Sequence, residues 1–370
     1  MNCGIMARKE SILIMKQTVH HPSPAAASRT LNVALAVGLL LLGSAYCGLA
    51  QSGVLSQGLT LWLDADNVNV GGNPSDDSPV LFWHDLSGLG NDASAPAANA
   101  AVYRAAVLNG HGGVDFSGSD SNYLATAYTS AFSFTNCTML MVANHADQQV
   151  HVSISGLQIS QEFLLYDKST CHESAPYHWA LKTHQVSPAG FFIQAGLFGA
   201  SSNEMVNFIN GVVSTEAVQY SWEIGQEFGV ADYVPTDRQA ILGWRNGSAI
   251  SGPAISSENF NGVICEVLVY DRQLTIVELN QVSHYLEGKY GIPLSRPPLQ
   301  LQLLSAGAGS MAFTWAASPG LTYQVQSCTN LSSAAWLDWG NSQSTTGSAL
   351  WATNALGTER QRFYRVRLLP

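Results

Sequence analysis

Pairs of carboxylates are the first residues to consider, because most glycoside hydrolases place two of them about 5–9 Å apart around the scissile bond. Asp64 and Asp66 have the spacing of residues that share one face of a strand. That strand is expected to end near Asp64, so ordinary loop polarity is the preferred interpretation. In the run 263–271, alternation gives Glu266 only apolar or aromatic neighbours on its own face and puts Asp271 on the other. The sequence therefore predicts no catalytic residue.

The sequence also gives no support for other common catalytic motifs. The chain contains neither the G-x-S-x-G turn of serine hydrolases nor the H-E-x-x-H pair of zinc proteases. Five histidines fall between residues 145 and 184, with Cys171 and Glu173 among them. Their spacings match no compact zinc pattern, so scattered strand and loop histidines are preferred. Whether the chain is an enzyme stays open, and no motif supports one.

Calcium is the more plausible metal, since it takes oxygen ligands from acidic and amide loops. Asp85, Asn91 and Asp92 fall within one short turn, and Asp85 and Asn91 are the expected ligands if a metal binds. The alternative is structural: the Asp85 side chain would hydrogen-bond the turn backbone, while Gly88 and Gly90 adopt positive φ. The structural turn is preferred and calcium is kept as the alternative.

A ligand surface needs exposed aromatic rings with nearby hydrogen-bonding groups. Trp244, Arg245 and Asn246 combine a ring, a guanidinium and an amide beside a glycine, and they are the predicted ligand-binding residues. Core packing is the default interpretation for the other large aromatics of this region.

Composition limits the class of protein. The 370 residues are 46% hydrophobic and 11% charged, which excludes global disorder. A formal charge of −10 argues against a nucleic-acid partner, because duplexes attract basic surfaces. The length suggests two domains.

The N-terminus predicts export. Residues 31–50 carry no charge and follow a basic segment, and Gly48 and Ala50 form a small-x-small site. We expect residues 1–50 to be a signal peptide cut after Ala50; an uncleaved membrane anchor is the alternative. No later segment is long and apolar enough to span a membrane, so the mature protein would be secreted, periplasmic or held at the cell surface.

Export permits disulfides. Cys137 with Cys171 is the pair to test, whereas Cys265 lies in an apolar run that predicts a buried thiol.

From residue 59 to 294 the pattern is short β-rich runs separated by turn residues, which predicts an antiparallel sandwich. Asn210-Gly211 predicts a tight hairpin. One helix is expected from a cap at Thr275, ended by Gly288 and Gly291. Residues 295–298 read as a linker, and 299–370 as a smaller β-sandwich.

Three segments carry a family resemblance: 61–65 (LWLDA), 83–93 (WHDLSGLGNDA) and 260–291, which holds the last strand and the helix. With them, residues 51–294 resemble bacterial laminin-G-like, concanavalin A-like jelly-roll domains. Residues 299–370 are similar to small fibronectin-III-like domains, through 323–331, Trp336 and 362–366. The resemblance implies an all-β, concanavalin A-like jelly-roll sandwich plus a small C-terminal β-sandwich. It also implies calcium near loop edges in some members.

That fold hosts sugar-binding modules, adhesion modules and some glycoside hydrolases, so fold alone does not decide function. The expectation is a secreted, non-catalytic recognition protein that binds a polysaccharide or a cell-surface glycan or protein. A structural or adhesive envelope protein without a small ligand is one alternative. A divergent glycoside hydrolase is the other, and it would need acids from different strands to converge.

Overall fold

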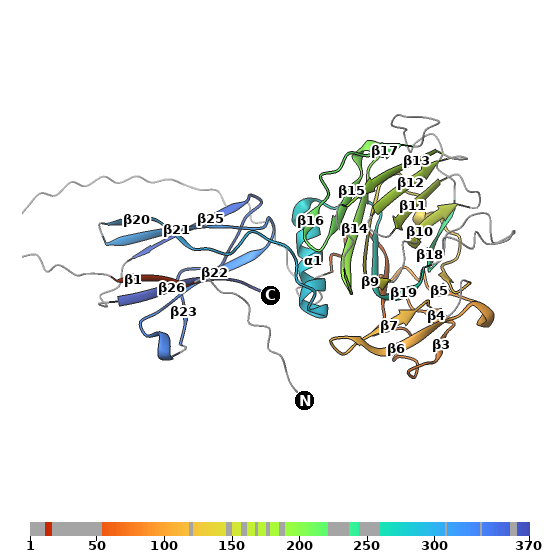
Figure 1. Ribbon diagram of the computed structural model, residues 1–370, viewed down its shortest axis with the longest axis horizontal. Helices are drawn as coiled ribbons and strands as arrows, with labels where there is room; N and C mark the ends of the chain where they lie inside the picture. Colours follow the sequence, from red (N-terminus) through yellow and green to blue (C-terminus); the bar gives the residue numbers. More distant parts are fainter. Residues whose placement is uncertain are drawn as a thin grey trace, which may run out of the picture. The chain divides into compact units, whose positions relative to one another are not determined.

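The computed structural model describes residues 12–16, 54–117, 121–145, 150–156, 161–166, 169–174, 178–184, 189–220, 237–243, 260–307, 309–333, 335–355 and 361–370. The chain divides into two compact units (Figure 1). One comprises Val54–Arg296; the other comprises Pro297–Leu369 together with the N-terminal strand β1 (Ile12–Lys16).

The first unit contains two antiparallel sheets, each with nine strands among the described residues. The first sheet has the order β16 (Val212–Val213), β15 (Val206–Ile209), β14 (Phe192–Phe198), β9 (Cys137–His145), β19 (Gly262–Tyr270), β7 (His111–Asp115), β6 (Ala101–Leu108) and β3 (Pro79–Val80), with β2 (Leu59–Asp64) also paired to β19. The second has the order β17 (Gln219–Tyr220), β13 (His178–Thr183), β12 (Ser169–Ser174), β11 (Gln161–Tyr166), β10 (Val150–Gly156), β18 (Arg238–Leu242), β8 (Leu124–Ala125), β5 (Ala93–Ser94) and β4 (Phe82–Trp83).

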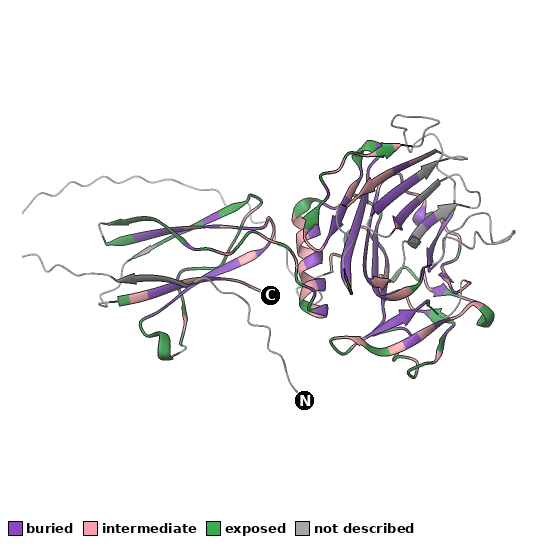
Figure 2. Cartoon of the chain, viewed as in Figure 1, coloured by how far each residue is buried: buried purple, intermediate pink, exposed green. Residues whose placement is uncertain are grey.

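Strand alternation explains how the first sheet is buried on both faces. In β9, Met139 and Met141 belong to the core shared by the two sheets, while Leu140 and Val142 belong to a second core on the opposite face. The second core is completed by helix α1 (Ile276–Tyr290), which packs one side against the sheet (Figure 2). The middle of the first sheet therefore lies between the other sheet and a helix.

Helix α1 begins as the sequence predicts. The Thr275 side chain accepts the Glu278 backbone N–H, and the Glu278 side chain accepts the Thr275 backbone N–H, which is a capping box. The prediction that Gly288 helps to end the helix is wrong, because α1 continues through it to Tyr290. Gly291 ends it at φ 69°, in the left-handed region that glycine adopts most easily.

The second unit is a smaller sandwich with a core around Phe313, Trp315, Tyr323 and Tyr364. Its three-stranded sheet is β20 (Gln302–Gly307), β21 (Ser310–Ala316) and β25 (Ala349–Ala355). Its five-stranded sheet is β1, β26 (Gln361–Leu368), β22 (Thr322–Cys328), β23 (Leu337–Asp338) and β24 (Gln343–Ser344). Short 3-10 turns occur in the chain at Ala97–Asn99, Ser130–Phe132, Ser202–Glu204 and Leu331–Ser333.

The predicted all-β class is confirmed, and every described strand pair is antiparallel. The suggested Cys137–Cys171 disulfide is wrong: neither cysteine is disulfide-bonded. Cys137 faces the core between the sheets, whereas Cys171 packs with Leu164 in a separate cluster. Cys265 is a buried thiol, as expected. Among the described residues, no helix combines the length and apolar character needed to cross a membrane.

Candidate functional site

A β-bulge in β19 places Glu266. Ile264 pairs with Ala143 and Glu266 pairs with the next residue, Val142, so Cys265 is an extra residue in the strand. Ile264 packs into the core between the sheets, while Cys265 packs on the α1 side. The alternation assumed from the sequence, with Ile264 on the same face as Glu266, is therefore wrong. A bulge re-aims side chains in this way, and here it turns Glu266 toward α1.

Glu266 is fully buried, and four donors reach its carboxylate. Its Oε1 accepts from the Trp62 indole N–H at 2.9 Å and from the Tyr285 hydroxyl at 3.2 Å. Its Oε2 accepts from the Tyr290 hydroxyl and from Lys289 Nζ, both at 2.8 Å. One donor comes from β2 and three come from α1. The carboxylate thus links the helix to two neighbouring strands.

Two more acids lie against the same ammonium group. Asp64 stands opposite Glu266 in the β2–β19 pairing, and its Oδ1 is 2.7 Å from Lys289 Nζ. Asp66 Oδ2 is 3.5 Å from the same nitrogen and 2.6 Å from His111 Nδ1. We call Asp64, Asp66, Glu266, Lys289 and His111 the Lys289 cluster.

Burial and charge act in opposite directions inside the Lys289 cluster. Burial raises the pKa of Glu266, although the neighbouring Lys289 opposes this. Burial would lower the pKa of Lys289, but the charges of Glu266 and Asp64 outweigh it, and the pKa is raised. Burial also opposes ionisation of Asp66, but hydrogen bonds from Gly112 and His111 outweigh it and lower its pKa. Lys289 therefore stays protonated among acids that need its charge.

The chemistry of the Lys289 cluster is ion pairing inside the protein. Glu266 has no exposed surface, and the Asp64 side chain is 7% exposed, so neither is placed to touch a substrate. Only Asp66 and His111, at 30% and 29%, have substantial contact with solvent. The sequence identifies Asp64, Asp66 and Glu266 as candidate acids but does not show that they converge. A glutamate in an apolar strand, with a lysine in the last turn of the next helix, was the available signal.

The turn containing Asp85 and Asn91 is occupied by internal hydrogen bonds. Asp85 Oδ1 accepts from the backbone N–H groups of Trp62 and Ser87, both at 2.9 Å. Its Oδ2 accepts from the Ser87 hydroxyl at 2.7 Å and the Asn91 backbone N–H at 2.9 Å. The Asn91 side-chain amide donates to the Thr60 carbonyl at 2.8 Å. These contacts favour the structural turn, in which the acid fastens residues 85–91 to β2.

Other expected groups fall in different places. Trp244, Arg245 and Asn246 lie outside the described residues, which stop at Gly243 and resume at Phe260. His172 is buried and stacks on Phe163 at 5.0 Å, and burial lowers its pKa to about 3. Within the described part of the chain, no group of three or more His, Cys, Asp or Glu side chains is arranged to hold a metal ion.

Comparisons with known proteins do not supply a family. No family model matches the chain, and no curated protein matches it. Among solved structures, Trypanosoma rangeli sialidase in complex with sialic acid aligns at 13% identity with a TM-score of 0.37, over 63% of this chain and 33% of the sialidase. Domain 4 of AbnA, a GH43 extracellular arabinanase from Geobacillus stearothermophilus in complex with arabinotriose, aligns at 15% identity and 0.36, over 61% and 97%.

This chain therefore matches about a third of the length of the sialidase. At these identities and TM-scores the likeness carries no argument about a site, a substrate or a reaction.

Proposed function

We propose that the chain is an exported recognition protein that binds carbohydrate at a surface without transforming it. Its first unit would be a laminin-G-like, concanavalin A-like module, as the resemblance of residues 51–294 implies. The observation that carries the non-catalytic part of the proposal is the Lys289 cluster. Two of its three acids, Asp64 and Glu266, are buried and paired with Lys289. Glu266 also accepts hydrogen bonds from two tyrosine hydroxyls of α1.

The hydrolase alternative meets only one of its requirements. Acids from different strands do converge, because Asp64 on β2 stands opposite Glu266 on β19. A glycosidase also needs both carboxyl groups to reach the scissile bond, one of them as an acid or a nucleophile. Glu266 is fully buried and bonded to four donors, so its arrangement suits fastening a helix better than attacking a sugar.

The test combines thermal unfolding with product detection on protein recovered after export. A ligand that binds only the folded state raises the free energy of unfolding, and with it the unfolding midpoint. The gain is about 2.7 kcal/mol when the free ligand concentration is a hundred times its dissociation constant. We expect at least one soluble polysaccharide to raise the midpoint while no reducing ends are released. Release of reducing ends by the wild-type protein, lost in Glu266→Gln, would establish the hydrolase instead.

Calcium and EDTA arms of the same experiment test the metal prediction at Asp85 and Asn91. If the turn is structural, Asp85→Ala lowers the midpoint equally with calcium and with EDTA, because buried turn hydrogen bonds are lost in both. A calcium-dependent rise that disappears in Asp85→Ala would establish a calcium site. If no polysaccharide changes the unfolding midpoint and the protein still associates with cells, the result would favour the structural or adhesive envelope protein.

A further inference from the structure

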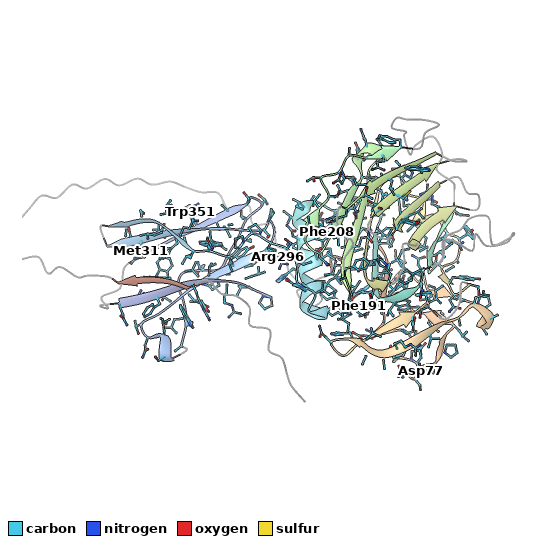
Figure 3. The ribbon with its side chains drawn as sticks, viewed as in Figure 1. Asp77, Phe191, Phe208, Arg296, Met311 and Trp351 are labelled. Atoms are coloured by element: carbon cyan, nitrogen blue, oxygen red, sulfur yellow. The ribbon has the colours of Figure 1, made fainter. Side chains whose placement is uncertain are left out.

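The three-stranded sheet of the second unit exposes a tryptophan on its outer face. Trp351 lies in the middle of β25 between Leu350 and Ala352, both of which are buried in the core of the unit. The Trp351 side chain points away from that core, and the residue is 65% exposed (labelled in Figure 3). A large ring left in water on an edge strand forgoes the free energy that burial would provide.

Strand pairing sets polar side chains beside this ring. Trp351 pairs with Thr314 on β21, and Thr314 pairs with Gln302 on β20, so the three residues form one row across the sheet. Adjacent strands are about 4.8 Å apart, and the row therefore spans roughly 10 Å. The Thr314 hydroxyl donates to the Leu350 carbonyl at 2.9 Å and keeps its lone pairs for another donor. We call this row, with Thr353, the Trp351 face.

The charge of the surface indicates what it would bind. Strands β20, β21 and β25 contain no Asp, Glu, Lys, Arg or His. By contrast, β26 in the other sheet carries three arginines, Arg362, Arg365 and Arg367. An anionic polymer or a charged peptide would find no counter-charge on the Trp351 face. An uncharged ligand with apolar and hydroxyl-bearing sides complements it, and a neutral sugar ring has both.

Trp336, another tryptophan of this unit, differs from Trp351 because a cation of the chain covers its ring. The Arg365 guanidinium lies 4.4 Å from the ring centre of Trp336 and donates to Gln326, so Trp336 already has a partner within the chain. Among the described residues, no ring or cation contacts Trp351 in this way. The Trp351 ring is instead 65% exposed.

We propose that the Trp351 face binds an uncharged polysaccharide, with the Trp351 ring stacked on a sugar and Thr314 and Gln302 hydrogen-bonding its hydroxyls. This rests on the proposed carbohydrate-binding function and adds a site in the small unit. The small C-terminal sandwich would then take part in recognition.

The experiment compares wild type with Trp351→Ala in the whole exported protein, using affinity electrophoresis in gels that contain xylan, galactomannan, mixed-linkage glucan or alginate. Leu337→Ala is the matched control, because Leu337 is a 72% exposed apolar residue on the other sheet of the same unit. We expect Trp351→Ala to weaken binding to a neutral polysaccharide ten-fold or more. Leu337→Ala should bind like wild type, and Trp351→Phe, which keeps a ring, should retain part of the affinity.

Each other outcome has a separate meaning. If wild type binds a neutral polysaccharide and Trp351→Ala binds it equally well, this inference is overturned and the proposed function stands. If wild type binds no polysaccharide, both are overturned. Binding to alginate alone would overturn the neutral-ligand assignment. A concentration-dependent dimer that Trp351→Ala abolishes, without any polysaccharide binding, would make the face a contact between copies. An unchanged unfolding midpoint in Trp351→Ala would show that lost binding is not lost folding.

Discussion

Glu266 and Lys289 depend on each other in a way that neither residue type reveals alone. A carboxylate buried without a counter-charge is strongly unfavourable, and so is a buried ammonium. Here one ammonium lies within 2.8 Å of two carboxylates, and tyrosine and tryptophan donors occupy the other positions around Glu266. Removing the single positive charge leaves more uncompensated charge than removing one of the negative ones.

This asymmetry predicts an order of stability. Lys289→Met should lower the free energy of unfolding by about 3–5 kcal/mol, the range for breaking a buried ion pair. Glu266→Gln should cost less, because Lys289 keeps Asp64 and the glutamine still accepts hydrogen bonds. Chemical denaturation of the purified variants measures both. Lys182→Met on β13 is the control for loss of a lysine, with an expected change within about 0.5 kcal/mol. Equal effects at Lys289 and Lys182 would contradict the role of the Lys289 cluster.

Local chemistry was predictable wherever neighbours in sequence supply it. Asn210 and Gly211 have φ of 47° and 89°, as the predicted hairpin turn requires. The Asp85 turn likewise uses partners a few residues away, such as Ser87 and Asn91. Glu266 was misread because its partners lie on β2 and α1, and because strict alternation cannot foresee a bulge.

Helix α1 is held at both ends by charged side chains. At its start, Arg272 forms hydrogen bonds of 2.8 and 2.9 Å with the two carboxylate oxygens of Glu278. Near its end, Glu287 Oε2 lies 2.9 Å from His284 Nδ1 and 2.6 Å from an Arg296 nitrogen. Burial opposes ionisation of Glu287, but these two partners outweigh it and lower its pKa from 4.5 to about 2.

The lowered pKa of Glu287 predicts how stability depends on pH. Because the folded state favours the ionised form, this contribution is complete above about pH 4.5 and disappears as the pH falls toward 2. Glu287→Gln should therefore cost roughly 1–2 kcal/mol at pH 7 after allowance for solvent screening, and little at pH 2. Denaturant titrations at both pH values measure the difference. An equal cost of Glu287→Gln at pH 7 and at pH 2 would contradict the assignment.

Element types were easier to predict than their limits and partners. The strand at 59–64 and the capped helix were both expected and are both present as β2 and α1. Strand β12 could not be predicted from its own sequence, STCHES, which is polar for a strand; pairing with β11 and β13 overrides that preference.

At the scale of the molecule, each unit has its own core. The small unit packs Phe313 against Tyr364 and Trp339, with ring centres 4.8 and 5.3 Å apart. The first unit has the core between its sheets and the core beneath α1. Units with separate cores are able to unfold separately.

Calorimetry should therefore show two transitions that respond to different substitutions. Phe313→Ala should lower or abolish only the transition of the small unit, at a cost of about 3–5 kcal/mol. Leu286→Ala on α1, where the side chain is fully buried, should affect only the other transition, by about 2–5 kcal/mol. A single transition that moves in both variants would show that the units unfold together.

The Lys289 cluster joins the two ends of the first unit, since β2 is the first strand of that unit and α1 is its last element. During synthesis Asp64 is made near the start of this unit, whereas Lys289 is made only as its last element is completed. Until the final helix emerges, the central strand of the sheet lacks the charge that Glu266 needs and the apolar cover that Leu268 needs. The order of synthesis thus delays completion of the sandwich until nearly the whole unit has been made.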